Sequence, residues 1–317
     1  WFQALGSAPS VVTLSQWFSK KERGKLYGIW SVSHSIGEGV TFVCTAVVVS
    51  HFGWRYGFNA AGMVGLAMGV ILLFMLVDRP RTYGLPDVHE FSKEAAPEQE
   101  EGPKLTLMQQ QLKAFKYPAV WVLGLASALT YVSRYAINSW GVIYLQEAKG
   151  YSLVKAGAVM GVYPAAGIIG AAVSGFISDY IFKSNRHLST LFYGVIQIAS
   201  LVILFFGPKG ILWLDIVGMA MFGFAVCGVI TFLGGLTAID LTPRSVTGAV
   251  MGFIGFFSYM GASAQDWISG YMIQKTTTIV NGQTMHNYDT VRYFWVGAAI
   301  LSLILAMSVW KVKPRED

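Results

Sequence analysis

Long apolar stretches separated by short polar segments dominate the chain. Residues 191–206, 211–238 and 296–310 are nearly uninterrupted runs of apolar side chains, and about 20 such residues cross the hydrocarbon core of a bilayer. The runs are continuous, whereas the strands of a membrane barrel alternate in polarity over about ten residues. Because a helix satisfies its own backbone hydrogen bonds in lipid, the pattern predicts an all-α integral membrane protein.

The spacing of the apolar stretches predicts nine membrane helices. An odd number of helices places the two ends of the sequence on opposite sides of the membrane. The nine predicted segments are residues 2–18, 25–50, 55–77, 117–146, 154–180, 188–207, 211–239, 246–274 and 289–311.

The longest connection, residues 78–116, is rich in Glu, Lys and Pro, which is typical of a solvated linker. It separates three predicted helices from six. If the linker joins two halves of six helices, three helices precede residue 1, and the substrate binds at mid-membrane between the halves. We therefore expect residues 1–77 to be helices 4–6 of the N-terminal half, residues 78–116 a cytoplasmic linker, and residues 117–317 the C-terminal six-helix half.

Composition supports a membrane location, and charge sets the orientation. Hydrophobic residues make up 54% of the sequence and charged residues 13%, against roughly 25% charged in soluble domains. The net charge of +6 comes from Lys and Arg that flank the apolar segments, which argues against nucleic acid as a partner. Sixteen of the 23 Lys and Arg lie in or beside alternate loops and the C-terminal tail. The positive-inside rule makes this side cytoplasmic, so we expect a plasma membrane protein, bacterial inner membrane, with a cytoplasmic C-terminus.

Arg134 is the most informative single residue, because it lies inside the predicted segment 117–146. A cation at mid-membrane costs a few kcal/mol even on lenient scales, so it should face a wet cavity and an anionic partner. No acid lies within one helical turn of it in the sequence. We expect its guanidinium to bind a phosphate or carboxylate through two parallel hydrogen bonds. The alternatives are a structural ion pair within the bundle or a side chain that extends to the membrane surface.

Three more polar side chains are candidates for substrate binding. His34 lies in an apolar segment, and histidine can exchange protons or bind phosphate near physiological pH; its alternative role is helix packing. Tyr131 and Tyr259 can donate phenolic hydrogen bonds to an anion, although aromatic side chains of this size commonly serve packing or the membrane interface.

We expect Asp266, in the predicted segment 246–274, to be the only acid well inside a membrane helix. Such an acid can couple ions or set selectivity, and the alternative is a hydrated position near a helix end. Residues 175–186 end another segment at the predicted cytoplasmic face. There Asp179, Lys183 and Arg186 can hold neighbouring helix ends by charge, which predicts a gating loop; a solvated helix end would also carry such charges.

Motifs for covalent chemistry are not visible in the sequence. It contains no nucleophile–base pair, metal-ligand cluster or glycine loop suited to cradle phosphates. We therefore expect neither an enzyme nor a bound cofactor or metal.

Five stretches of the sequence resemble the major facilitator superfamily. Within it they are similar to the organophosphate:phosphate antiporters, a group that includes glycerol-phosphate and hexose-phosphate transporters and a hexose-phosphate sensor. The stretches are WFSKKERG at 17–24, WSVSHSIG at 30–37, YVSRYAINSW at 131–140, GFISDYIFKSNR at 175–186 and GFFSYMG at 255–261. The resemblance implies a fold of twelve helices, nine of which this sequence contains.

The resemblance also implies roles for the candidate residues. Arg134 would be one of two arginines that clamp phosphate, one from each half, with His34 beside them and Tyr131 and Tyr259 lining the cavity. The second arginine would lie on the first helix, outside this sequence. Three positions depart from the pattern of the glycerol-phosphate carriers: Ser139 replaces an acid, Pro164 a membrane glutamate and Cys227 a cavity tyrosine. These departures argue against glycerol phosphate as the substrate, and Asp266 would offset the lost negative charge.

The expected function is secondary transport by alternating access. The protein would sit in the lipid bilayer and exchange an organic phosphate, such as a hexose phosphate, for inorganic phosphate. One alternative is a membrane sensor that binds a sugar phosphate and signals to a partner kinase. A second alternative is a carrier of an organic carboxylate, for which Arg134 is equally suitable.

Overall fold

The computed structural model describes most of the chain as two compact units, Trp1–Gly37 with Val48–Pro103 and Glu38–Val47 with Lys104–Asp317. Side chains are not described at 20–31, 34, 179, 247–248, 278–280 and 283–285. The described residues are 13, 17–18, 20–77, 80–86, 106, 108–109, 112, 115–183, 185–233, 247–280 and 283–309.

Helices are confirmed at eight of the nine predicted positions, and most of the remaining segment, 2–18, lies outside the described residues. The helices are α2 (Lys20–Phe52), α3 (Trp54–Met75), α6 (Pro118–Glu147), α7 (Leu153–Phe176), α8 (Arg186–Phe206), α9 (Leu212–Thr231), α11 (Thr247–Lys275) and α12 (Asp289–Ser308). Two short elements accompany them, η1 (Pro80–Tyr83) and a π-helical turn η2 (Ile177–Ile181).

Seven helices in the described part of the chain are long and apolar enough to cross a membrane. The exception among the eight is α11, which has 29 residues and is therefore long enough. Its polar side chains lower its hydropathy; they include Ser258, Gln265, Asp266 and Ser269. Ser258, Gln265 and Ser269 are buried and point into the protein, whereas Asp266 is exposed.

The first unit contains the turn between α2 and α3 and the start of the polar connection. Gly53 joins the two helices with a φ of 89°, a conformation that only glycine adopts without strain. Trp17 donates its indole N–H to the carbonyl oxygen of Val77 at 2.9 Å, and its ring meets that of Tyr83 edge-on. The predicted division into residues 1–77, 78–116 and 117–317 stays a prediction.

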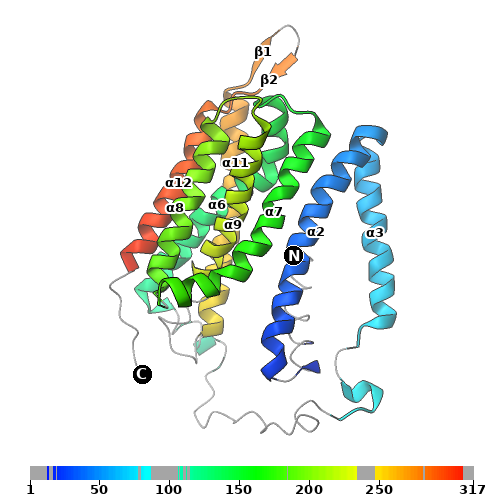
Figure 1. Cartoon of the computed structure of the whole chain (residues 1–317), viewed down its shortest axis with the longest axis vertical. Coiled ribbons are helices and arrows are strands. Elements are labelled where there is room, and N and C mark those ends of the chain that lie inside the picture. Colours follow the sequence, from blue (N-terminus) through cyan, green and yellow to red (C-terminus); the bar gives the residue numbers. More distant parts are fainter. Residues whose placement is uncertain are drawn as a thin grey trace. The chain divides into compact units, whose positions relative to one another are not determined.

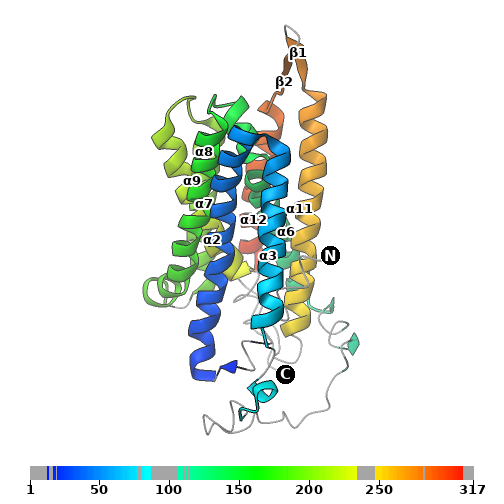
Figure 2. The ribbon, with the colours of Figure 1, turned by 90° about the vertical axis from the view of Figure 1, so that its right-hand side faces the viewer.

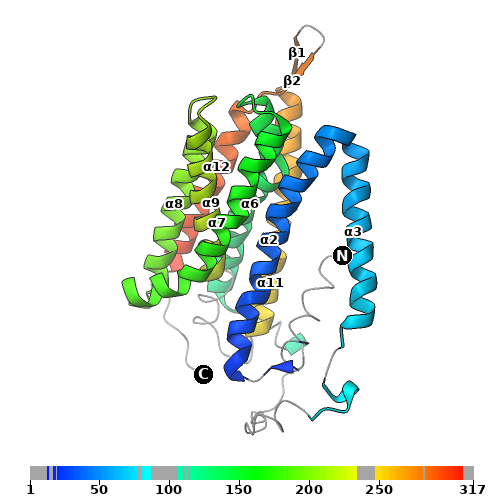
Figure 3. The ribbon, with the colours of Figure 1, turned by 45° about the vertical axis from the view of Figure 1, so that its right-hand side comes forward.

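The second unit is a bundle in which the helices from α6 to α12 run roughly along one direction (Figure 1). α7 and α8 pack on α9, while α11 and α12 pack on α6, and α12 also contacts α8. In Figure 2, α12 lies between the group of α7, α8 and α9 and the pair of α6 and α11. Figure 3 shows the same bundle from an intermediate angle, with α8 at its left edge. The core holds large, fully buried side chains, including Trp295, Tyr163 and Phe222.

Glycine allows α7 and α9 to approach closely. A Cβ atom at Gly223 of α9 would collide with the backbone carbonyl oxygen of Tyr163, and one at Gly170 of α7 with the backbone of Phe224. Small residues at such crossings let helix backbones touch, which is how helices associate in membranes. The position of Tyr163 is therefore set by backbone packing as well as by its side chain.

A two-stranded hairpin was not expected from the sequence. β1 (Thr278–Val280) pairs antiparallel with β2 (Gln283–Met285), and Ile279 lies opposite Thr284. The hairpin projects beyond one end of the bundle between α11 and α12 (Figure 1). The signal was present, because a β-branched run followed by Asn-Gly at 281–282 favours a hairpin.

Candidate functional site

Arg134 lies near the middle of α6 and is half-buried. Its Nε donates a hydrogen bond to the hydroxyl oxygen of Tyr163 on α7 at 3.2 Å. Its Cζ also lies 5.6 Å from the centre of the Tyr131 ring, a distance at which a cation is attracted to the ring face. Two tyrosines from two helices therefore hold the guanidinium in place.

The terminal nitrogens of Arg134 remain available for a ligand. Within the part of the chain that the structure describes, neither Nη1 nor Nη2 has a hydrogen-bond partner, and no carboxylate forms an ion pair with the guanidinium. A guanidinium anchored through Nε presents these two nitrogens as a planar pair that matches the oxygens of a phosphate or carboxylate. The site can therefore bind an oxyanion in a bidentate manner.

Aromatic side chains form a wall beside Arg134. Tyr131 stacks on Tyr135 with ring centres 5.9 Å apart and meets Tyr259 of α11 edge-on at 5.7 Å. Tyr259 is 60% exposed, so its hydroxyl can be reached from outside the packed core. The structure thus brings together three of the predicted substrate-binding residues: Arg134, Tyr131 and Tyr259.

Glu38 is a site residue that the sequence analysis missed. It lies within α2, and Asn138 of α6 donates its side-chain Nδ2 to Glu38 Oε1 at 2.7 Å. Glu38 also interacts electrostatically with Arg134. The expectation that Asp266 is the only acid well inside a membrane segment is therefore wrong. The sequence did carry the signal, because Glu38 is an acid inside the predicted segment 25–50, just before a mostly apolar stretch.

Residues 38–47 of α2 reach α7 through small side chains. A Cβ at Gly39 would lie 3.2 Å from Cγ of Pro164, and one at Gly157 would crowd Ala46 and the carbonyl of Phe42. Pro164 is buried within α7, and it packs against Gly39 of α2. Cys227, another departure, lies in α9 against Gly167.

Asp266 is exposed on α11, two helical turns beyond Tyr259 and on the same face. Among the described residues it forms no ion pair with Arg134. His34 belongs to α2 in the other unit, and its side chain lies outside the described residues. The predicted proximity of His34 to Arg134 stays a prediction.

The predicted gating loop is a tight connection between α7 and α8. Arg186 begins α8, and its Nη1 donates to the buried hydroxyl of Ser178 in η2 at 2.7 Å. Lys183 is exposed and has a φ of 51°, a left-handed conformation that few residues other than glycine adopt. The side chain of Asp179 lies outside the described residues. Arg186 therefore ties the two helix ends together, and the contacts of Asp179 stay a prediction.

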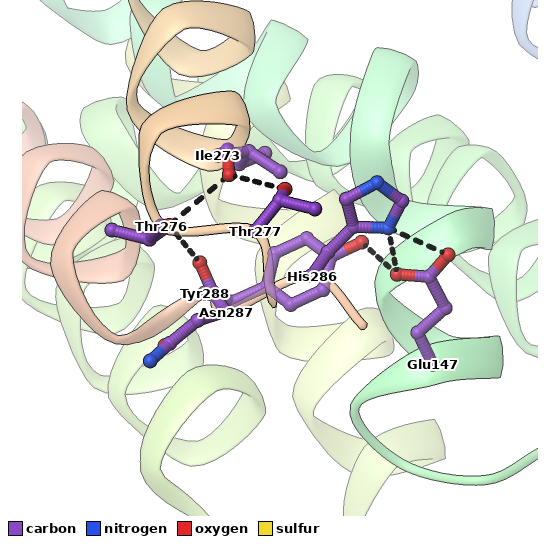
Figure 4. Close-up of polar contacts among 7 residues, drawn as sticks. All are labelled: Glu147, Ile273, Thr276, Thr277, His286, Asn287 and Tyr288. Carbon is purple, nitrogen blue, oxygen red and sulfur yellow. Dashed lines mark hydrogen bonds and ion pairs between the residues drawn. The ribbon is translucent and has the colours of Figure 1, made fainter. Parts of the chain in front are cut away.

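A second polar cluster lies where the hairpin joins the bundle (Figure 4). His286 Nδ1 lies 3.0 and 2.8 Å from the two carboxylate oxygens of Glu147, and the Tyr288 hydroxyl donates to Glu147 Oε2 at 2.7 Å. Burial, and then the hydrogen bond to Glu147, raise the pKa of Tyr288 above its ordinary value. Thr276 bonds the carbonyl of Asn287 at 2.9 Å, so side chains fasten both ends of the loop.

A buried ion pair joins the loop after α6 to the first turn of α9. Lys149 Nζ lies 3.0 Å from Asp215 Oδ1, and the two side chains are 2% and 0% exposed. Lys149 also donates to the carbonyl of Gly207 at 3.1 Å, and the Tyr151 hydroxyl donates to Asp215 Oδ2 at 2.6 Å. Burial and the hydrogen bond to Asp215 raise the pKa of Tyr151 to about 12. The buried ion pair and the hydrogen bonds of Lys149 and Tyr151 fix these side chains in place, which suits a structural role.

The sequence is similar to a family of membrane transport proteins and to several of its individual members. The sequence model of the Major Facilitator Superfamily matches residues 1–265. "Membrane sensor protein UhpC" of Salmonella typhimurium is 34% identical over 269 residues, covering 84% of this chain and 61% of that protein. A "Probable hexose phosphate transport protein" of Chlamydia trachomatis is 30% identical over 99% of this chain and 70% of its own length. A "Glycerol-3-phosphate transporter" of Bacillus subtilis is 28% identical over 100% of this chain and 70% of its own length. The chain thus spans about three fifths of the length of the sensor that it matches.

Proposed function

The chain belongs to the major facilitator superfamily, and we propose that it is a secondary transporter that exchanges a phosphorylated organic solute, such as a hexose phosphate, for inorganic phosphate. The family consists of integral membrane transporters and not of enzymes. Relatives named as hexose phosphate and glycerol-3-phosphate transporters match the organophosphate:phosphate antiporter group, which supports phosphate esters as the class of cargo.

The hydrogen bonding of the Arg134 guanidinium is the main support for this function. Its Nε is taken by Tyr163, while Nη1 and Nη2 have no partner among the described residues. A guanidinium fixed in this way loses little rotational freedom when an anion binds, so more of the interaction energy appears as affinity. Two oxygens of one phosphate can accept hydrogen bonds from Nη1 and Nη2 at the same time.

Transport additionally requires that binding changes the conformation. We propose that residues 117–317 form one half of the transporter, that residues 1–77 belong to the other half, and that 78–116 connect them in the cytoplasm, where the C-terminus also lies. Phosphate would draw the halves together only if it binds the closed intermediate more tightly than the open states. Arg134 supplies that differential charge, together with a second arginine from the other half.

The remaining candidates complete the proposal. His34 would lie beside the phosphate, and Tyr131 and Tyr259 would line the cavity. Asp266 would set selectivity or couple ions on the exposed face of α11. Asp179, Lys183 and Arg186 would control the cytoplasmic gate at the connection between α7 and α8.

Exchange of labelled phosphate tests the proposal. The full-length protein in liposomes preloaded with phosphate should take up labelled phosphate, and Arg134→Lys should largely abolish uptake, because lysine cannot replace a bidentate contact. Arg55→Lys is the matched control, since Arg55 is an exposed arginine at the start of α3, and it should retain uptake. Equal uptake by wild type and Arg134→Lys would overturn the assignment.

A sensor of sugar phosphates is the second candidate, and the 34% identity to a membrane sensor protein favours it. A sensor would use the same anion site and would signal to a partner kinase. Binding of hexose phosphate by the full-length protein without any exchange of phosphate would assign the sensor role.

A carrier of organic carboxylates is the third candidate, because Arg134 can bind either anion. Inorganic phosphate should compete for the site if the cargo is a phosphate ester. Uptake of a labelled carboxylate that phosphate fails to inhibit would assign the carboxylate role.

A further inference from the structure

Asn138 lies one helical turn from Arg134 on α6. Residues four apart on a helix share a face, with their Cβ atoms about 5–6 Å apart. Asn138 donates Nδ2 to Glu38 Oε1 at 2.7 Å, and the opposite placement of its amide would set its oxygen against the carboxylate. The orientation of the Asn138 amide is therefore fixed by charge.

The Asn138–Glu38 pair has hydrogen-bonding capacity that the described residues do not use. Asn138 Oδ1 is buried and has no hydrogen-bond partner in the described part of the chain. No ion pair to Glu38 occurs among those residues either. Buried acceptors are normally paired, so Asn138 Oδ1 lacks a donor that a ligand can supply. Glu38 uses Oε1 for Asn138, and its half-buried carboxylate can accept a further hydrogen bond at the other oxygen.

The chemistry on the two sides of this face is complementary. Arg134 offers N–H donors, whereas the Asn138–Glu38 pair offers acceptors and negative charge. Phosphate oxygens are acceptors, so they bind Arg134 and are repelled by Glu38. Hydroxyl groups are donors that suit the amide and carboxylate oxygens. A molecule that carries a phosphate at one end and hydroxyl groups about one helical turn away satisfies both sides.

Resting on the function proposed above, we propose that Glu38 and Asn138 bind the hydroxyl groups of the organic part of the substrate, and so select polyol and sugar phosphates over phosphate esters without hydroxyls. Arg134 binds the phosphate in both cases. A site that pairs with hydroxyl groups rejects analogues lacking them, because its acceptors are then left buried and unpaired. Glu38 also disfavours a second anionic group at this end of the substrate.

If Glu38 only balanced the charge of Arg134, its removal would have a different effect on the affinity for phosphate esters. The counter-charge would act on the phosphate that all substrates share, so its removal would change the affinity for every phosphate ester alike. Hydroxyl binding changes the affinity for sugar phosphates alone. The ratio between two inhibitors therefore separates the two roles.

The test compares glucose 6-phosphate with methyl phosphate as inhibitors of labelled phosphate uptake by the full-length protein in liposomes. In the wild type, glucose 6-phosphate should inhibit at the lower concentration. In Glu38→Gln and in Asn138→Ala, the ratio of the two half-inhibitory concentrations should shrink by about tenfold. Asp289→Asn, an exposed acid at the start of α12, should keep the wild-type ratio.

The outcomes separate this inference from the function on which it rests. A ratio that is unchanged in both variants, or an equal loss for both inhibitors, overturns the inference and leaves phosphate transport standing. Absence of phosphate uptake in the wild type overturns the proposed function itself. If a variant does not transport, binding of the same two compounds to the purified full-length protein provides the same ratio.

Discussion

Arg134 of α6 donates its Nε–H to the hydroxyl oxygen of Tyr163 of α7 across 3.2 Å. Tyr163 is itself 1% exposed and packs against Phe222 of α9. The position of the guanidinium is therefore determined by the contact between α7 and α9. Any change that moves these two helices relative to each other should alter anion binding.

Replacement of Tyr163 by phenylalanine removes the acceptor for Arg134 Nε and retains the ring. Hydrogen bonds to charged groups contribute about 1.5–3 kcal/mol, so the apparent affinity for phosphate should fall roughly tenfold or more. Competition of unlabelled with labelled phosphate in liposomes measures this affinity. Tyr151→Phe removes a hydroxyl that bonds Asp215 and not Arg134, and it should leave the affinity unchanged. Equal affinity in Tyr163→Phe and the wild type would show that the hydrogen bond does not position Arg134.

Gly223→Ala should destabilise the second unit, because the new Cβ would collide with the carbonyl oxygen of Tyr163. Overpacking of this kind costs about 1–3 kcal/mol, and the displaced Tyr163 should also weaken phosphate binding. Thermal unfolding in detergent measures the first effect. Gly252→Ala is the control, because a Cβ there meets nothing within 4 Å; a similar loss of stability in both variants would contradict the explanation.

The fold was largely predictable from the sequence, because a membrane helix is encoded in its own apolar run. Eight predicted helices are confirmed, and α11 was found despite its polar residues. The contact between Gly223 and Tyr163, by contrast, joins two different helices, α9 and α7, whose backbones come close at this point. No periodicity in either segment indicates which turn of one helix lies against which turn of the other.

Loss of the Asp215 charge should strongly destabilise the protein. Asp215→Asn leaves Lys149 buried with a formal charge and only backbone carbonyls as strong partners, and breaking a buried pair costs about 3–5 kcal/mol. The temperature of unfolding should fall clearly. Asp289→Asn breaks the pair with Arg292, in which Asp289 is 66% exposed, and should change stability by less than about 1 kcal/mol. Similar effects of the two substitutions would argue against the structural role of the Lys149–Asp215 pair.

Glu147→Ala should release the loop that carries the hairpin. His286 and Tyr288 both lose their shared partner, so amide hydrogen exchange in residues 276–288 should become faster while the bundle stays folded. Gln146→Ala alters the neighbouring side chain on α6 and should leave that exchange unchanged. Protection that persists in Glu147→Ala would show that the hairpin is held by other contacts.

The candidate site was only partly predictable. Arg134 and Tyr131 could be identified from the sequence, because they lie close together within one apolar segment. Glu38 was equally visible and was overlooked, whereas its bond to Asn138 joins residues 100 positions apart. Such a pair depends on how residues 38–47 of α2 lie against α6, which the order of residues along either helix does not specify.

Binding of inorganic phosphate to the purified full-length protein, measured by isothermal titration calorimetry, tests the central role of Arg134 most directly. It applies equally to a transporter and to a sensor. We predict that the wild type binds phosphate and that Arg134→Lys, with an unchanged unfolding temperature, loses at least about tenfold in affinity. Equal affinity in the two proteins would show that Arg134 does not bind the anion.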